Sequence, residues 1–281
     1  MQLAVLLRSI QVVALLACGV ATVVSGRVDV SIAAGQSTEA QATLNRQPHL
    51  LERALAELKP SEQGRAHLYF VGFAGYGAEA VFKREVLAVR RLFDERFHTK
   101  GRSLGLINHR TTADEVPLAS VTNLESVLQH LGRFMDVDRD TLFLFLTSHG
   151  QEGVLTVHMP GFLLRQLRPV DLKKMLDRSG IRKRVVVVSS CHSGSFIPML
   201  ADARTLVIAA ARADRSSFGC EDRREWTYFG DAYFNRALRQ EISFRRAFAR
   251  AKQLIAGWEV ENRLIPSLPQ IAGGEALAEA E

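Results

Sequence analysis

The chain has few cysteines and few aromatic residues, and both shortages exclude classes of protein. Three cysteines among 281 residues are too few for the disulfide framework that stabilises small secreted domains. Aromatic residues make up 7% of the sequence, and the 36 lysines and arginines are spread among 30 acidic residues rather than gathered in tracts. With no nucleic-acid-binding motif either, a net charge of +6 does not indicate a nucleic-acid partner.

Long apolar runs are also scarce, and the one at the start of the chain differs from everything after it. Residues 1–26 contain an early arginine and then an apolar run at 10–24, which is shorter than the roughly 20 residues that a membrane-spanning helix needs. We expect a bacterial export leader, which would make the protein periplasmic, secreted or membrane-anchored. Three fates stay open: cleavage near Ser25 or Gly26, lipidation of Cys18 in the sequence LLAC, or retention as an anchor. Membrane contact is expected only through this segment.

Three further regions follow the leader. Residues 27–64 are polar and small and predict a linker or arm, with a short helix at 50–58. Residues 65–271 alternate between apolar runs and amphipathic stretches, which is typical of an α/β domain. Residues 272–281 predict a flexible acidic tail.

The elements of the α/β domain follow from its hydrophobic periodicity. We predict strands at 67–73, 103–109, 141–147, 184–190 and 205–211, with a hairpin at 153–159. We predict helices at 78–97, 122–135, 169–180 and 243–258, with one more beginning near Gly230. A capping box formed by Thr122 and Glu125 opens one of them. Continuous apolar strands separated by helices predict a three-layer sandwich with a mostly parallel central sheet.

Two of the predicted strands run directly into a reactive side chain. The stretch TLFLFLTSHG (141–150) ends on His149, and RVVVVSSCHSG (184–194) leads into Cys191. Ligands in parallel sheets bind beyond the carboxyl ends of the strands, so both side chains are expected in one crevice. Gly150 and Gly194 follow them and would let the backbone turn and approach a ligand closely.

A cysteine and a histidine brought together in this way can act as a nucleophile and its base. A free thiol is only a few per cent thiolate at neutral pH, so a neighbouring imidazole that accepts its proton makes it competent for attack. The backbone N–H groups of Gly150 and Cys191 are the natural donors to a developing oxyanion. On their own, however, Cys191 and Cys220 could also be small buried hydrophobic residues.

Several ordered motifs resemble one family. The TSHG and SSCHSGS elements, and the stretch LVIAAARADRSSFGCEDRREWTYFGDAYF at 206–234, resemble the legumain family of cysteine peptidases, in the clan that includes the caspases. The resemblance implies a caspase-like α/β sandwich. It also implies that His149 is the general base and acid, that Cys191 is the nucleophile, and that the Gly150 N–H lies in the oxyanion hole.

The resemblance extends to a specificity pocket, with departures. It implies that Ser216, Ser217 and Asp231 lie in that pocket. Legumains have a glutamate two residues before the nucleophile, where this chain has Ser189. They also have an asparagine that helps to orient the histidine, and the corresponding place near Gly75 has none. The motifs therefore leave open which residue is preferred before the cleaved bond.

Metal sites and other nucleophiles fit the sequence poorly. The stretch DVDRD (136–140) lacks the glycine and the glutamate of a calcium loop. The set Cys191, His192, His149 and Cys220 lacks the paired spacing of a zinc site. Ser193 and Ser195 lack a serine-hydrolase elbow and are expected to satisfy local backbone groups. We expect no metal and no cofactor.

These observations predict a cysteine endopeptidase that cleaves peptide or protein substrates through a thioester intermediate. A transamidase of the same family would use the same residues and pass the acyl group to an amine. A third interpretation is a binding module that keeps the fold without turnover, because the residue that orients the histidine is missing.

Overall fold

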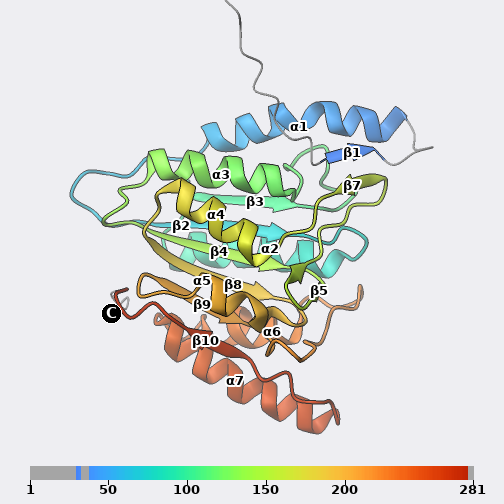
Figure 1. Ribbon diagram of the computed structural model, residues 1–281, viewed down its shortest axis with the longest axis vertical. Helices are drawn as coiled ribbons and strands as arrows, with labels where there is room; N and C mark the ends of the chain where they lie inside the picture. The colour runs from blue at the N-terminus through green and yellow to red at the C-terminus, as the bar shows by residue number, and fades with distance from the viewer. Residues whose placement is uncertain (1–29, 33–37, 278–281) are drawn as a thin grey trace, which may run out of the picture.

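The computed structural model describes residues 30–32 and 38–277 (Figure 1). The leader predicted from the sequence, with Cys18, Ser25 and Gly26, lies outside the described residues. No helix in the part of the chain that the structure describes is long and apolar enough to cross a membrane.

A six-stranded sheet forms the middle layer, in the order β10-β9-β8-β4-β2-β3. Five neighbouring strands are parallel, and β10 at one edge is antiparallel to β9. The bounds are Leu68–Ala74 (β2), Ser103–Ile107 (β3), Thr141–Thr147 (β4), Lys183–Ser189 (β8), Thr205–Ala209 (β9) and Gln270–Ala272 (β10). Alternate residues of the central strands enter two separate cores. In β4, Leu144 packs on one face of the sheet and Phe145 on the other.

Helices cover both faces of the sheet, as Figure 1 shows. One face is covered by α1 (Thr38–Ala56), α3 (Val121–Phe134), α4 (Pro169–Ser179) and α5 (Ile197–Leu200), the last preceded by the 3-10 turn η1 (Ser193–Phe196). The other face is covered by α2 (Ala80–Arg96), α6 (Tyr228–Gly230), the π-helical segment η2 (Asp231–Ala237) and α7 (Phe244–Glu261). The three-layer α/β sandwich predicted from the sequence is confirmed.

Two short antiparallel pairs lie outside the main sheet. β5 (Gly150–Gln151) pairs with β6 (Val154–Leu155), and β1 (Val30–Ile32) pairs with β7 (Phe162–Leu164). The hairpin predicted at 153–159 is therefore wrong in its bounds. The hairpin begins directly after His149, and its turn lies at Glu152 and Gly153.

Three predictions at the ends of elements were wrong. The helix expected at 50–58 is the end of the 19-residue α1, whose polar first half packs through hydrogen bonds, including those of the buried Gln47 to Leu118 and Ala113. Residues 272–277 are not a frayed tail, because backbone groups there bond to residues 202–203.

The capping box was also placed two residues too late. The N-cap of α3 is Ser120, which has an extended backbone and whose hydroxyl accepts the Asn123 N–H at 3.1 Å. Thr122 is already inside the first helical turn, so its side chain is not in the capping position.

Candidate active site

His149 and Cys191 lie at the same edge of the sheet. β4 and β8 are adjacent and parallel, and Thr147 is paired with Ser189. Each reactive residue follows its paired residue by two positions, and the Ser148 N–H donates to the Ser189 carbonyl at 3.2 Å between them. The two loops therefore leave the sheet side by side, as the order of strands predicted.

The backbone after His149 touches the backbone at Cys191. A Cβ atom added to Gly150 would lie 2.6 Å from the Cys191 carbonyl oxygen and 2.7 Å from the Ser190 hydroxyl oxygen. Only glycine fits here without a shift. The Cys191 thiol is partly exposed, and its Sγ lies 3.4 Å from the Ser217 nitrogen and 3.5 Å from the Ser217 oxygen.

The imidazole of His149 is held on three sides. The rings of Tyr76 and Phe82 meet it edge-on, with centroids 4.6 and 5.2 Å away. Its Nε2 lies 2.8 Å from a carboxylate oxygen of Glu79. An ionised carboxylate only accepts hydrogen bonds, so Nε2 is the donor and the neutral ring keeps its lone pair on Nδ1. This is the tautomer that a base acting through Nδ1 requires.

Glu79 was missed by the sequence analysis. It is the residue that precedes α2, with an extended backbone, and its side chain makes no capping hydrogen bond to the helix. An acidic residue before a helix is ordinarily read as a cap, so the pattern gave no reason to connect it with the histidine. The asparagine that legumains have near Gly75 is absent here, and the imidazole of His149 contacts Glu79.

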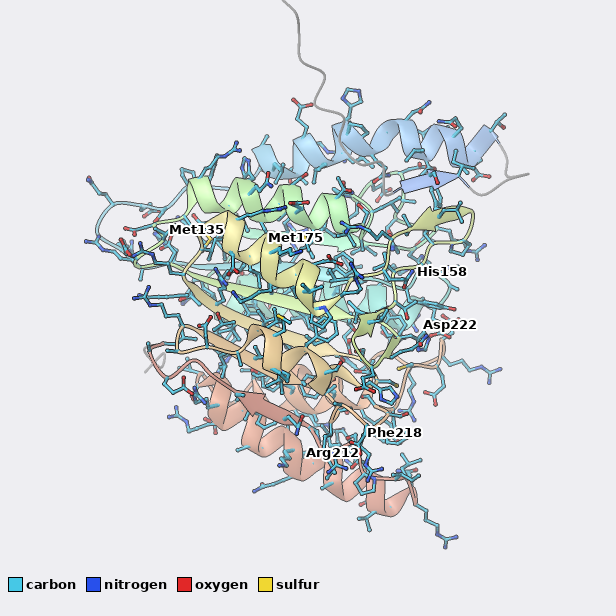
Figure 2. All side chains as sticks on the ribbon, viewed as in Figure 1. Met135, His158, Met175, Arg212, Phe218 and Asp222 are labelled. Atoms are coloured by element: carbon cyan, nitrogen blue, oxygen red, sulfur yellow. The ribbon has the colours of Figure 1, made fainter. Side chains whose placement is uncertain are left out.

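The beginning of α2 also holds the segment 206–234. The Ala80 N–H donates to the Asp222 carboxylate at 2.6 Å. Arg84 donates to the carbonyl oxygens of Asp222 and Arg224. In Figure 2, Asp222, Phe218 and His158 lie toward the right of the view, and Met135 lies toward the left.

A carboxylate is buried beneath this same region. Glu85 is fully buried and accepts hydrogen bonds from the Thr147 hydroxyl at 2.7 Å and from the Thr227 hydroxyl at 2.8 Å. Burial raises the pKa of Glu85, although these hydrogen bonds act in the opposite direction. The Thr227 hydroxyl lies 3.4 Å from that of Ser189. The position that holds a glutamate in legumains is thus a serine here, with a carboxylate from α2 behind it.

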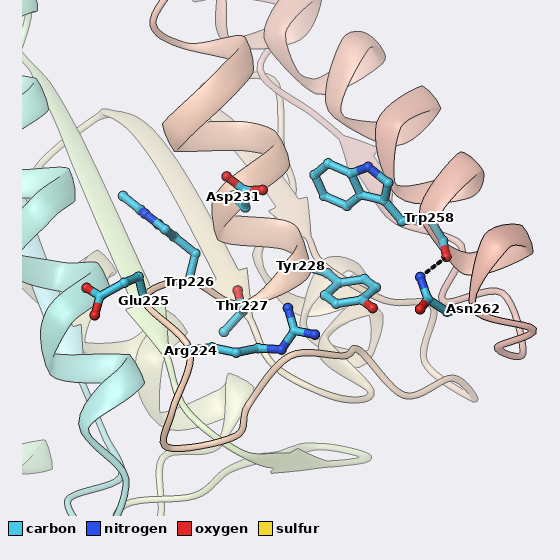
Figure 3. Close-up of a pocket in the computed structure, with 8 residues that line it drawn as sticks. All are labelled: Arg224, Glu225, Trp226, Thr227, Tyr228, Asp231, Trp258 and Asn262. Carbon is cyan, nitrogen blue, oxygen red and sulfur yellow. Dashed lines mark hydrogen bonds between the residues drawn. The ribbon is translucent and has the colours of Figure 1, made fainter.

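The predicted pocket residues are not all together. Ser217 contacts the Cys191 sulfur through its backbone, and Ser216 is exposed. Asp231 pairs with Arg236 at 3.0 Å and lines a separate cavity of about 340 Å³ (Figure 3). That cavity is also lined by Arg224, Glu225, Trp226, Thr227, Tyr228, Trp258 and Asn262. Thr227, which lines this cavity, also contacts Ser189 through its hydroxyl group.

The sequence and the fold both match known proteins. The sequence profile of the peptidase C13 family matches residues 123–272, more than half of the chain. The chain belongs to the peptidase C13 family. The match includes His149 and Cys191, and it begins after Glu79 and Glu85. The resemblance to legumain-like cysteine peptidases is confirmed at the level of the family.

Individual relatives of this C13 protein cover less of it. Legumains from Mus musculus and Rattus norvegicus are each 30% identical over 97 residues, and legumain from Bos taurus is 29% identical over the same length. These matches span 34% of this chain and 22% of each legumain. Caspase-1 from Spodoptera frugiperda has a TM-score of 0.52 at 12% identity, over 77% of this chain and 88% of its own, which confirms the caspase-like fold.

The residues that follow the C13 protein's cysteine turn away from it. His192 adopts a left-handed backbone, and its Nδ1 lies 2.8 Å from the Ala213 carbonyl oxygen. The Ser195 hydroxyl donates to the His192 carbonyl and accepts the Gly153 N–H, so its expected local role is confirmed. The expectation for Gly194 was wrong. Its N–H donates to the Ala211 carbonyl, so it packs inside the protein instead of facing a ligand.

Cys220 of the C13 protein differs from Cys191 in its surroundings. Burial, followed by the nearby Cys191, raises the pKa of the Cys220 thiol well above its ordinary value. It therefore stays a thiol at neutral pH. Within residues 30–32 and 38–277, no three histidine, cysteine or acidic side chains are grouped closely enough to hold a metal ion.

Proposed function

We propose that the protein is a cysteine endopeptidase, in which Cys191 attacks the substrate and His149 transfers the proton. The observation that carries the proposal is the shared edge of β4 and β8, which brings both residues to one place together with a carboxylate on the imidazole. The binding-module interpretation rested on a missing orienting residue. Glu79 fills that gap and therefore supports turnover.

The first step is activation of the thiol. His149 Nδ1 accepts the Cys191 proton, while Glu79 accepts the Nε2–H and stabilises the imidazolium that forms. Tyr76 and Phe82 limit rotation of the ring, because their edges lie against it. General acid and base catalysis of this kind contributes roughly 10² to 10⁴ in rate.

The thiolate sulfur then forms a bond to the carbonyl carbon of the substrate. The oxyanion is stabilised by the N–H groups of Gly150 and Cys191, each contributing roughly 3 kcal/mol. The imidazolium gives its proton to the departing amine as the C–N bond breaks, which leaves a thioester on Cys191. Water, deprotonated by His149, hydrolyses the thioester and regenerates the thiol.

The substrates proposed are peptides or proteins, and no metal or cofactor takes part in any step. Among the pocket residues, Ser217 contacts the Cys191 sulfur through its backbone, and Ser189 lies two positions before Cys191 in the chain. We also propose that the protein works after export, with any membrane contact made through residues 1–26. Glu85 supports the pocket from behind by fixing Thr227.

A peptide library tests the proposal directly. Cleavage products, identified by mass, are expected with the wild-type protein and are expected to disappear in Cys191→Ala and in His149→Ala. Cys220→Ala is the matched control, because it removes the other described thiol and is expected to cleave at the wild-type rate. A library left intact by a folded wild-type protein would favour the binding module.

The same assay separates hydrolysis from transamidation. A primary amine is added at increasing concentration, and the new carboxyl end of each product is examined by mass. If the enzyme is a hydrolase, the products should end in free carboxylates at every amine concentration too low for the amine to compete with water for the thioester. Amide products that dominate at low amine concentration would identify a transamidase instead.

A further inference from the structure

A second cavity lies at the other end of the sheet from Cys191. It has a volume of about 660 Å³ and is lined at the amino ends of the strands by Leu68 in β2, Thr141 in β4, Lys183 in β8 and Leu206 in β9. β4 has seven residues, so the cavity lies roughly 20 Å from the reactive edge. In Figure 1 this end of the sheet carries the start of α7.

The charged side chains that line this cavity are all basic. Five arginine and lysine residues line it, and no aspartate or glutamate does: Arg65, Arg96, Arg139, Lys183 and Arg245. His67 and His98 line it as well. Carboxylates outside the lining compensate for part of this charge: Arg65 and Arg139 have partners at 4.0 and 3.8 Å, and the buried Asp140 accepts the His67 N–H at 2.8 Å. The cavity therefore favours an anion.

Two of these basic residues have a nitrogen with no partner. Arg96 Nε and His67 Nε2 are buried and make no hydrogen bond. Buried donors are nearly always paired, and an unpaired one costs stability. The first turn of α7, with Ser243, Phe244 and Arg245, adds the positive end of an 18-residue helix to the same wall.

The rest of the lining is apolar. Phe97 and Phe244 stack at 5.6 Å between ring centroids, and the half-exposed Ile242 lies beside them. Val185, Leu206 and Leu277 complete the apolar wall. An inorganic anion would leave this surface in contact with water. The volume is within the range of roughly 300 to 1,000 Å³ that is usual for small-molecule sites.

We propose that this cavity binds a single-chain anionic amphiphile, with its carboxylate or phosphate head on Arg96 and Lys183 and its alkyl chain on Phe97, Ile242 and Leu206. Arg96 and Lys183, which line the cavity, would donate their terminal N–H groups to the head group. The chain would cover the apolar wall. This site is independent of the reactive cysteine.

Binding is measured by calorimetry on the full chain with decyl phosphate below its micelle concentration. Inorganic phosphate and decyltrimethylammonium are the paired probes, because one lacks the chain and the other reverses the charge. We expect decyl phosphate to bind at least tenfold more tightly than either. We also expect affinity to rise roughly threefold to fourfold for each methylene added between octyl and decyl phosphate. Equal binding of the decyl cation and the decyl anion would overturn the proposal.

Substitutions of residues in the cavity show whether decyl phosphate binds there. Arg96→Gln is expected to weaken decyl phosphate binding roughly tenfold or more. Arg91→Gln is the matched control, because Arg91 is exposed on the same helix and does not line the cavity. Lys183→Gln tests the same site from strand β8 instead of helix α2 and is also expected to weaken decyl phosphate binding. Thermal melting without ligand shows whether each variant folds. Equal affinities for Arg96→Gln and Arg91→Gln would refute the site, as would binding that occurs only after residues 278–281 are removed.

Discussion

Replacing Glu79 with glutamine isolates the contribution of its charge. The side chain keeps its size and a carbonyl oxygen, so it can still accept the Nε2–H of His149. The negative charge that stabilises the imidazolium is lost. Rotation of the amide also allows the opposite tautomer, in which Nδ1 carries the proton and cannot act as the base.

The size of the effect follows from the distance and the exposure of the pair. Charges roughly 4 Å apart interact by about 4 kcal/mol at an effective dielectric constant of about 20. The His149 side chain is 35% exposed and that of Glu79 is 29% exposed, so water screens much of this energy. We expect roughly 1 to 2 kcal/mol to remain, which lowers kcat/KM by roughly 5-fold to 30-fold.

The assay is steady-state hydrolysis of a fluorogenic peptide chosen from the library. Glu125→Gln is the matched control, because Glu125 pairs with Arg178 at 3.2 Å and is 28% exposed on the helix α3. The ¹⁵N spectrum of the imidazole reports the tautomer, which is expected to be Nε2–H in the wild-type protein and mixed in Glu79→Gln. Glu79→Asp is expected to restore part of the rate if it can reach the ring.

Two results would refute this reasoning. One is a kcat/KM for Glu79→Gln within twofold of the wild-type value. The other is an equal loss in Glu79→Gln and Glu125→Gln, since that would mean a general effect of removing a paired carboxylate.

Three other substitutions test the site. For Glu85→Gln, burial raises the wild-type pKa, so the contribution of Glu85 to wild-type stability is fully present below its unfolded pKa and is lost as pH rises through the folded pKa. The variant lacks this fall, so urea unfolding should show its relative stability increasing with pH, and a constant difference would contradict the burial. Gly150→Ala is expected to lose roughly 1 to 3 kcal/mol of unfolding free energy, because the Cβ meets the Cys191 carbonyl, and a melting temperature equal to wild type would exclude the contact. In Cys191→Ala, Cys220 is expected to resist iodoacetamide at neutral pH, since burial raises its pKa, and rapid alkylation would show that it is accessible as a thiolate.

The fold was largely predictable because its strands are buried on both faces. The run at 141–147 is apolar at nearly every position, and the bounds of β4 agree with it. α1 was underestimated, because Gln47 and its neighbours pack through hydrogen bonds that leave no apolar stripe. β10 was not predicted at all, since three residues that pair with β9 give no periodicity.

The positions of His149 and Cys191 could be predicted from the sequence, but the residues that support them could not. His149 and Cys191 each follow a continuous apolar strand, so topology alone placed them together. Glu79 and Glu85 are charged residues at the start of a helix, and such residues are usually solvent-exposed or capping. Their roles depend on contacts with residues 62 or more positions away, which no local pattern contains.

Helix α2 therefore links the reactive residues to the proposed pocket. Glu79 holds the imidazole, Arg84 holds the segment 206–234, and Glu85 fixes Thr227. All three lie before the region that matches the family profile.

The most direct test of the account is the position of a covalent adduct. The protein is treated with a peptide that carries a thiol-reactive electrophile, and the modified residue is found by intact mass followed by peptide mapping. A single adduct on Cys191 is expected, and it should form much more slowly in His149→Ala. An adduct on Cys220, or equal rates with and without the His149 imidazole, would contradict it.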